Sequence, residues 1–363
     1  MQSGYPLQTR SYRIEGMETS ISIGYRILHD PANAGIKSSR MVFISSGLPD
    51  RYQKYLADLF QDSEIVRVKD GETVKSLDGA VSIFDSLAGS TIERGDSIAY
   101  AGGGTLGDVV GFAASTFKRG IGLAAIPTTF LAQIDSAIGG KNGINFRNAK
   151  NMIGSFYLPG FVFSDSYFLE GMTDKLFLNG LGELLKYYIL NPEEFRWSLL
   201  GEGADEMRWN MDALEQAVLT CTRLKMDYVS RDFRDLAGIR RMLNFGHTIG
   251  HALESATEFR ISHGEAVFWG MMLESLWVQA RGINASRIVS LLRPYLPFFA
   301  SSRRLFEPVL GEIKGFVMQD KKITRDTIAL PFPIEPGVAG SVDMKISDLE
   351  GFLSHNPLED EVE

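Results

Sequence analysis

Apolar positions in the first part of the chain follow two spacings that alternate along the sequence. Short apolar runs and period-two patterns predict strands at residues 21–27, 41–44, 65–68 and 97–101. Residues 52–60 and 74–87 instead carry the three-to-four-residue spacing of amphipathic helices. Strands that alternate with helices predict an open, largely parallel α/β sheet.

The pattern changes to almost continuous helical periodicity at about residue 173. It predicts helices at residues 175–190, 212–229, 246–257, 265–279 and 285–296, and one lone strand at 327–332. A chain of 363 residues is longer than a single hydrophobic core usually grows. We therefore predict two domains, an α/β domain at residues 1–172 and an all-α domain at residues 173–363.

Composition narrows the class of protein. Hydrophobic residues make up 44% of the chain, and uncharged apolar runs stay shorter than the roughly 18 residues that span a bilayer. The start of the sequence has no signal-like apolar stretch, and a single cysteine, Cys221, excludes an internal disulfide. On these grounds we expect a cytoplasmic protein that does not bind a membrane. The net charge of −8 also argues against a nucleic-acid partner. An anionic substrate would then need a local cluster of lysine and arginine.

Three of the five histidines fall within residues 243–266. His247 and His251 stand four positions apart, so on a helix both imidazoles project from one face, about 6 Å apart. His263 follows a turn and opens the next apolar helix. Catalytic zinc sites typically take three protein ligands and keep one position open, so two histidines and a carboxylate would suffice. Ordinary helix-face histidines are the alternative interpretation.

A glycine-rich turn joins the strand predicted at 97–101 to the following helix. Gly102, Gly104 and Gly107 have the G-x-G-x-x-G spacing that lets backbone approach a diphosphate at a helix N-terminus. A plain tight turn is the alternative. No acidic residue follows about 20 positions later, as a Rossmann fingerprint requires. A ribose would therefore be held from elsewhere, and Glu72 and Lys75 are the candidates.

Further charged residues stand in weakly polar surroundings. They include a dense polar set made of Arg119, Asp135, Lys141, Lys150 and Asn151, in which the two lysines and the arginine supply the local basic cluster. Asp135 either caps a loop or is held by cations. Glu183 and Lys186 share one helix face among apolar neighbours. They form either a surface pair or a buried one, in which a metal would partner Glu183 and a substrate oxygen Lys186. The other candidates are Lys225, Arg240, Asn244 and the segment Asp320, Lys321 and Lys322.

Together these segments resemble the sugar-phosphate cyclases, and most closely the 3-dehydroquinate synthases. The strings GGGTLGDVVGFAASTFKRG, IPTTFLAQIDSAIGGKNGIN, KNMIGSFYLPG, GELLKYY, LNFGHTIGHALE, HGEAV and DKK follow that family's order between residues 71 and 322. The resemblance implies an NAD-binding α/β domain followed by a helical domain that binds metal and substrate.

The resemblance also implies a role for each matching residue. Glu183, His247 and His263 would bind a divalent ion, zinc or cobalt. NAD would contact Glu72, Lys75, Gly103, Gly104, Thr105, Asp108, Thr128, Thr129, Lys141, Lys150 and Phe168. The substrate phosphate would lie on Lys141, Asn151, His251 and Lys321, joined by Arg119 of a second subunit. The carboxylate end would lie on Lys225, Arg240 and Asn244, while Asp135, Lys150 and Lys186 would position NAD and the reacting hydroxyls.

The activity implied is that of a carbon–oxygen lyase of the shikimate pathway, which leads to the aromatic amino acids. Its substrate is a phosphorylated sugar acid, 3-deoxy-D-arabino-heptulosonate 7-phosphate, and its products are 3-dehydroquinate and phosphate. The steps would be transient oxidation by NAD, phosphate elimination, reduction and intramolecular aldol closure. Because Arg119 would serve a neighbouring site, we expect a homodimer.

The chain departs from the family's pattern at a few positions. Asn142 stands where threonine is common, Gly182 where alanine is common, and Gly171 where a threonine is expected, while RDFRDLAGIR makes the stretch before Arg240 one residue longer.

Three alternatives for the function remain. A cyclase that makes 2-deoxy-scyllo-inosose or 2-epi-5-epi-valiolone would act on a substrate without a carboxylate, so Arg240 and Asn244 favour the synthase. The others are a metal-dependent NAD polyol dehydrogenase and a non-catalytic nucleotide-binding protein.

Overall fold

The computed structural model describes residues 7–30, 33, 36, 38–147, 149–195, 204–318, 323–324, 326–354 and 357–358. The chain forms two compact units. The first comprises Met1–Met172 and Asn210–Arg234, and the second comprises Thr173–Trp209 and Asp235–Glu363. Among the described helices, none is both long enough and apolar enough to cross a membrane.

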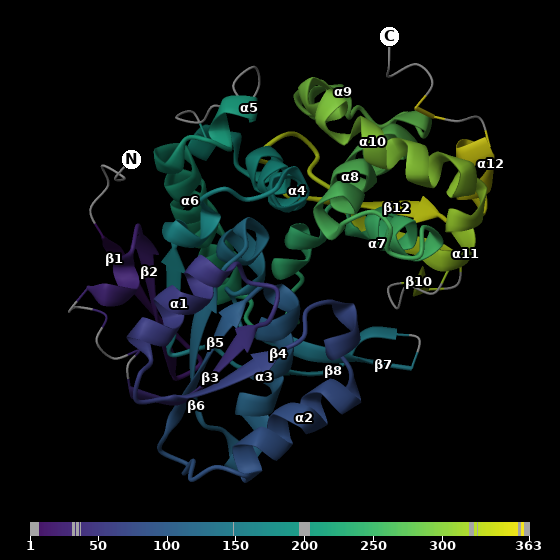
Figure 1. The fold of residues 1–363 in the computed structure, drawn as a ribbon. Helices are drawn as coiled ribbons and strands as arrows, with labels where there is room; N and C mark the ends of the chain where they lie inside the picture. The colour runs from purple at the N-terminus through teal and green to yellow at the C-terminus, as the bar shows by residue number, and fades with distance from the viewer. Residues whose placement is uncertain are drawn as a thin grey trace. The chain divides into compact units, whose positions relative to one another are not determined.

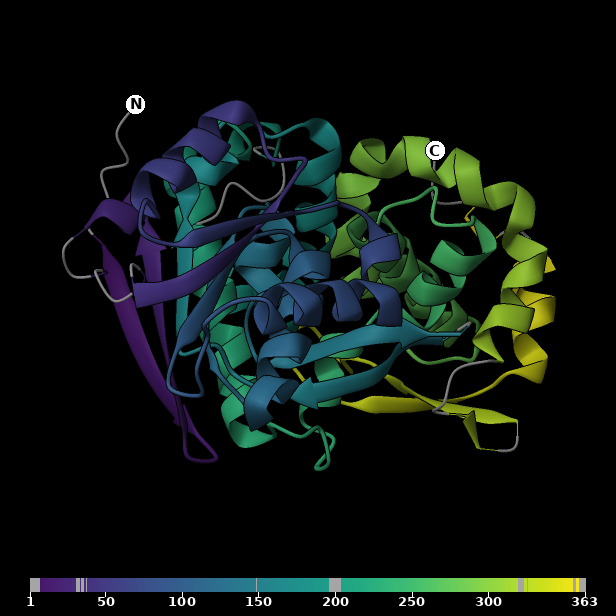
Figure 2. The same ribbon diagram turned by 60° about the horizontal axis from the view of Figure 1, so that its bottom comes forward.

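A seven-stranded sheet forms the centre of the first unit (Figure 1). Its strands, in spatial order, are β1 (Gln8–Ile14), β2 (Met17–Gly24), β9 (Phe161–Asp165), β6 (Gly122–Pro127), β5 (Ser97–Gly102), β3 (Ser39–Ser45) and β4 (Glu64–Val68). Only the edge pair β1–β2, the purple hairpin of Figure 2, is antiparallel within this sheet. The predicted open and largely parallel sheet is thus confirmed.

Helices cover the sheet because its strands alternate apolar residues towards both faces. Helix α1 (Asp50–Leu59) buries Leu56 against Val42 and Ile44 of β3, within one hydrophobic cluster. Helices α2 (Leu77–Ala88) and α3 (Gly104–Thr116) pack against each other, and α3 also packs on β5 and β6. A hairpin that the sequence analysis did not predict, β7 (Lys141–Phe146) and β8 (Ala149–Phe156), packs on α3.

Helix α6 (Met211–Arg231) belongs to the first unit, although the sequence analysis placed these residues in the second domain. The helix packs against β1, β2 and the π-helical turn η5 (Ala132–Ser136). Its helical periodicity resembles that of the segments around it, so the pattern alone carried no sign of this packing. Contacts with residues far away in the sequence decide its place.

The second unit is mostly helical. Its helices are α4 (Asp174–Leu190), α5 (Ala204–Met207), α7 (His247–Ala256), α8 (His263–Ala280), α9 (Ser286–Leu292), α10 (Leu296–Phe306), α11 (Ile313–Val317) and α12 (Ser347–Ser354). The helix predicted at 285–296 is interrupted by the 3-10 turn η9 (Arg293–Tyr295), where Pro294 lacks the N–H that would continue it.

The second unit also contains a small antiparallel sheet, which the prediction of an all-α domain missed. The strand predicted as isolated at 327–332 is β11 (Thr327–Pro331), and it pairs with both β10 (Ile323–Thr324) and β12 (Ser341–Lys345). The helical character of this part of the chain is confirmed, with the sheet as an addition. The strand register joins sequence-distant segments that no local pattern connects.

Helices α7 and α8 touch through their backbones. A Cβ atom added at Gly270 of α8 would lie 1.9 Å from the carbonyl oxygen of Gly246, immediately before α7. At this distance backbone would have to move, so only glycine permits the crossing as it stands. The pair α7–α8 is thus fixed by contact between main chains.

We expect Gly270→Ala to lower the free energy of unfolding by about 1–3 kcal/mol, the usual cost of overpacking a core. The matched control is Gly315→Ala in α11, where a Cβ would meet no heavy atom within 4 Å. That change should be neutral or stabilising by up to about 1 kcal/mol, because alanine favours helix. Denaturant unfolding of both variants measures the difference, and equal stability of the two would contradict the close crossing.

Candidate functional site

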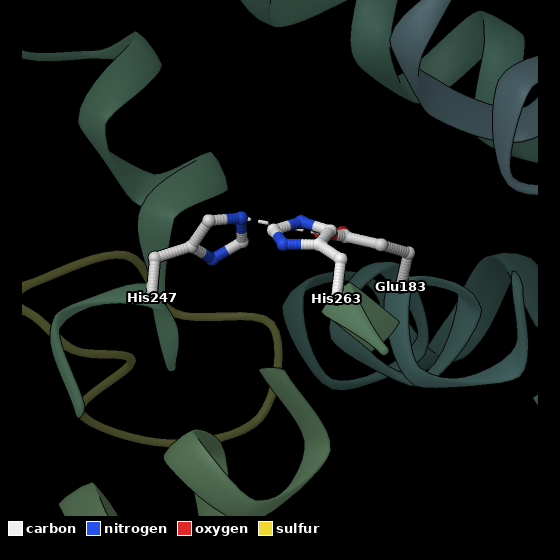
Figure 3. A group of neighbouring side chains, drawn as sticks. All are labelled: Glu183, His247 and His263. Atoms are coloured by element: carbon white, nitrogen blue, oxygen red, sulfur yellow. Dashed lines mark hydrogen bonds and ion pairs between the residues drawn. The ribbon is translucent and has the colours of Figure 1, made fainter. Parts of the chain in front are cut away.

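Three side chains from three helices of the second unit meet at one point (Figure 3). Glu183 lies within α4, while His247 and His263 are the first residues of α7 and α8. The Nε2 atoms of both histidines lie 3.1 Å from the same oxygen, Oε1 of Glu183. The three ligand atoms lie within 4.8 Å of one another, and Glu183 is only 1% exposed. The structure therefore brings all three predicted metal ligands together.

Hydrogen-bond partners orient the two imidazoles. Nδ1 of His247 lies 3.2 Å from the carbonyl oxygen of Phe245, and Nδ1 of His263 lies 3.5 Å from Oε2 of Glu254. With Nδ1 as the donor in each ring, Nε2 keeps its lone pair for a metal. Sequence reasoning missed Glu254, although it lies seven residues after His247 on the same helix and so near the same face.

The charges in this group compensate one another. Burial would raise the pKa of Glu183, but Lys186 and His247 outweigh burial and hold the pKa well below its usual range. Burial, joined by the nearby charges of Lys186 and His263, lowers the pKa of His247 although Glu183 raises it. Burial also lowers the pKa of His263, but Glu254 and Glu183 together raise it to about 10. Without a metal ion, the site thus holds an ionised Glu183, a neutral His247 and a protonated His263.

Other predicted substrate residues border this group. Lys186 is 1% exposed and forms an ion pair with Glu183, which selects the buried pair over the surface pair. The exposed His251 has its ring centroid 5.4 Å from that of His247 and 5.9 Å from that of His263. Arg240, which is buried, and Asn244 lie in the 3-10 turn η8 (Arg240–Asn244), which leads into α7.

The predicted nucleotide residues of the first unit gather at the carboxyl ends of its parallel strands. Glu72 lies beyond β4, Gly103 beyond β5 and Thr128 beyond β6. Strands β3 and β5 are neighbours in the sheet. The chain adds β4 on the outer side of β3 but adds β6 on the outer side of β5, so the order in which strands are added changes direction between β3 and β5. Ligands of open α/β sheets bind at such a switch point. Gly103 is the residue before α3, so the glycine turn faces a helix N-terminus there as predicted.

Polar contacts join the remaining residues at this edge. Lys75 forms an ion pair with Asp108 of α3, and burial raises the pKa of Asp108 although Lys75 opposes the change. Asn145 of the β7–β8 hairpin donates to Oε1 of Glu72 over 2.7 Å and accepts from the N–H of Asn151 over 3.0 Å. Asn145, which sequence reasoning missed, thus links two predicted sites, the ribose residues and the phosphate residues.

The structure also places the other predicted residues of the first unit. Thr105 lies in the first turn of α3, and Thr129 follows Thr128 and accepts from the N–H of Ala132. Lys141 is exposed at the start of β7, and Lys150 lies in β8. Gly104 opens α3.

Asp135 is held by a cation, one of the two alternatives for it. It lies in η5, and Nζ of Lys225 in α6 is 2.9 Å from both its carboxylate and its carbonyl oxygen. Lys225 is 7% exposed. The structure therefore gives Lys225 a contact with Asp135 that the resemblance did not imply.

Two predicted residues lie apart from these groups, and a third falls outside the residues that the structure describes. The Phe168 side chain is 3% exposed and packs on Tyr52 and Tyr55 in the core, so it offers a nucleotide no ring surface. Arg119 is exposed and follows the far end of α3, about 20 Å along the helix from the glycine turn. Lys321 lies outside the described residues.

Comparison with known proteins identifies the family. Residues 65–179 match the family model "3-dehydroquinate synthase N-terminal", and residues 180–323 match "3-dehydroquinate synthase C-terminal". A 3-dehydroquinate synthase of Saccharolobus solfataricus is 37% identical over 88% of this chain and 89% of its own length. One of Thermoplasma volcanium is 36% identical over 91% and 93%.

Solved structures share the fold at lower identity. A 2-deoxy-scyllo-inosose synthase, crystallised with carbaglucose-6-phosphate, NAD+ and Co2+, superposes with a TM-score of 0.85 at 24% identity, over 96% of this chain and 99% of its own. The 2-epi-5-epi-valiolone synthase of Streptomyces hygroscopicus, with NAD+ and Zn2+ bound, gives a TM-score of 0.77 at 24% identity, over 96% and 98%. These likenesses establish the architecture.

We expect metal binding to release about one proton near pH 7.5, because His263 with a pKa of about 10 must lose its proton to become a ligand. Metal affinity should therefore rise about tenfold per pH unit below that pKa. Calorimetry of zinc binding in buffers of different ionisation enthalpy counts the proton. Glu254→Gln removes the charge that does most to raise the pKa of His263. In this variant, both the number of protons released on metal binding and the dependence of metal affinity on pH should therefore decrease. A wild type that releases no proton would contradict this account of His263.

Proposed function

Since the chain belongs to the 3-dehydroquinate synthase family, we propose that it converts 3-deoxy-D-arabino-heptulosonate 7-phosphate to 3-dehydroquinate and phosphate. The observation that carries the proposal is the convergence of Glu183, His247 and His263, within a chain that matches the family over both halves. The reaction is a phosphate elimination framed by a transient oxidation and a reduction, followed by aldol closure. The proposal includes a cytoplasmic location.

The three converging side chains fit a divalent metal ion. Tetrahedral zinc with bonds of about 2.0–2.1 Å places its ligand atoms about 3.3 Å apart, close to the 3.1 Å between Glu183 Oε1 and each histidine nitrogen. Two imidazoles and one carboxylate suit zinc or cobalt, and three ligands leave positions for substrate hydroxyls. A bound ion would act as a Lewis acid that stabilises negative charge on substrate oxygen.

The first unit fits a dinucleotide. Gly103 and Gly104 let its diphosphate approach the N-terminus of α3, where backbone N–H groups and the helix dipole favour anions. Glu72 and the Lys75–Asp108 pair lie at the same edge of the sheet and can hold ribose hydroxyls. NAD bound there would supply a hydride acceptor that is regenerated in each turnover.

The remaining polar residues match the anionic groups of the substrate. We assign Lys141, Asn151 and His251 to the phosphate, together with Lys321. Arg240 and Asn244 take the carboxylate, which a cyclase of simple sugar phosphates would not need. Lys186 is buried beside Glu183 and can hold a proton near the reacting oxygen, because the Glu183 carboxylate pairs with its ammonium. Asp135, paired with Lys225, and Lys150 position the reacting groups.

A homodimer is part of the proposal because of where Arg119 lies. It is exposed at the amino edge of the sheet, whereas the nucleotide residues of the same chain lie at the carboxyl edge. We assign this guanidinium to the phosphate in the site of a second subunit, as the family resemblance implies.

We expect purified protein with zinc or cobalt and catalytic NAD to release phosphate from 3-deoxy-D-arabino-heptulosonate 7-phosphate without lasting NADH. His247→Ala should reduce the rate more than about a hundredfold, because a metal ligand is lost. His29→Ala, an exposed histidine of the first unit, is the matched control and should keep the rate. Phosphate release and nicotinamide absorbance are followed together.

Other outcomes of that assay point to other functions. Turnover of glucose 6-phosphate or sedoheptulose 7-phosphate instead would assign one of the other cyclases. Steady accumulation of NADH from a polyol would assign a dehydrogenase. No turnover with any of these substrates would sink the catalytic proposal.

Mixing two inactive variants tests the shared site. Arg119→Ala and His247→Ala should each be nearly inactive, yet a mixed dimer would contain one intact site. When equal amounts of the two variants have exchanged subunits, half of the dimers are mixed, and each mixed dimer has one working site out of two. We therefore expect about a quarter of the wild-type activity. Arg119→Lys is the conservative control. No recovery in a mixture that has exchanged subunits would place Arg119 outside the neighbouring site.

A further inference from the structure

Helix α7 begins at the metal ligand His247, but the residue before it cannot cap the helix. That residue is Gly246, which has no side chain and adopts a left-handed backbone with φ 79°. The first N–H groups of a helix lack partners within the helix, and leaving them buried and unpaired is costly. His247 and Thr248 are both buried, so this helix start needs a partner from elsewhere in the protein.

Glu274 of α8 is that partner. Its Oε2 accepts from the N–H of Gly246 over 2.9 Å, and its Oε1 accepts from the N–H groups of Thr248 and Ile249 over 3.1 Å each. Glu274 is 0% exposed. Both carboxylate oxygens are thus committed to the first turn of α7, where the helix dipole also favours a negative charge.

This contact connects two of the three metal-binding elements. Glu274 lies about three helical turns after His263 on α8, and its carboxylate holds the main chain on both sides of His247 on α7. The carbonyl of Phe245, in the same segment, lies 3.2 Å from Nδ1 of His247 and sets the direction of the ring. A shift of this helix start would therefore move Nε2 of His247 away from Glu183 and His263.

We propose that Glu274 is a positioning residue of the metal centre, which fixes the start of α7 so that His247 meets the other two ligands. The inference rests on the proposed function, because it takes Glu183, His247 and His263 as the ligands. It assigns a measurable part of the metal affinity to a fully buried acid that lies eleven residues or more from every ligand in the sequence. Glutamine is not equivalent, since its amide group offers one acceptor oxygen and turns an N–H donor towards another donor.

The test is cobalt binding by the full-length protein. The dissociation constant is measured by competition with a chelator, and the visible absorption of the bound ion reports its geometry. The variants are Glu274→Gln, the conservative Glu274→Asp, and Glu215→Gln as the matched control. Glu215 is also a buried glutamate, but it lies in α6 of the first unit and accepts from Ser166.

We expect Glu274→Gln to weaken cobalt binding by about 10- to 100-fold, the usual effect of removing an outer partner of a metal ligand, and to change the absorption bands. Glu274→Asp keeps both oxygens on a shorter side chain and should fall between Gln and wild type. Glu215→Gln should bind cobalt like the wild type even if its melting temperature falls.

Each contrary outcome has a definite meaning. A Glu274→Gln protein that is less stable yet binds cobalt within about twofold of wild type, with unchanged bands, would show a purely structural role and overturn the proposal. If Glu274→Gln cannot be obtained folded, Glu274→Asp decides by the same two readouts. A wild type that fails to bind cobalt would overturn the metal assignment of the proposed function, and the positioning role with it.

Discussion

The metal-binding group depends on how closely three helices can approach one another. A Cβ atom at Gly182, beside Glu183, would lie 1.9 Å from the carbonyl oxygen of Gly264, and one at Gly264, beside His263, would lie 1.9 Å from that of Asn179. The backbones of α4 and α8 are therefore in contact at the position of the ligands. Metal–ligand distances tolerate only about 0.2 Å of error, so larger side chains at this crossing would separate the ligands by more than a metal can bridge.

Such close packing places charge where water does not reach, and the residues compensate for it. Glu183 is almost fully buried, and alone it would be strongly destabilised. Lys186 and the protonated His263 neutralise it, while Glu254 balances the proton on His263. Removing one member of such a cluster leaves an uncompensated buried charge, whereas a divalent ion can replace the proton of His263. The same residues thus compensate one another's buried charge and can also bind a metal ion.

Local signals in the sequence were enough for much of this architecture. Strand and helix periodicity predicted the parallel sheet and its helices, and the clustering of His247, His251 and His263 indicated a candidate metal site. The family resemblance, not the spacing, implied the ligand set that includes Glu183. The residue Glu274 and the contact between two predicted residues, Lys225 and Asp135, were missed. Glu274 contacts residues 25 to 28 positions away, and Lys225 contacts Asp135 across 90 positions. Contacts over such separations produce no periodic pattern of apolar and polar residues in the sequence. The same reason explains α6, whose own pattern gives no sign of the unit to which it belongs.

The family resemblance implies one added residue in the stretch RDFRDLAGIR, and the fold indicates where such a residue can be accommodated. An extra residue inside a helix would rotate everything beyond it by about 100°. Here α6 continues without interruption through Lys225 to Arg231, and the chain leaves the first unit after Arg234. The implied extra residue would therefore fall in the connection between α6 and η8. A connection absorbs an added residue at little cost, so Lys225 keeps its contact with Asp135, and Arg240 keeps its buried place at the start of η8.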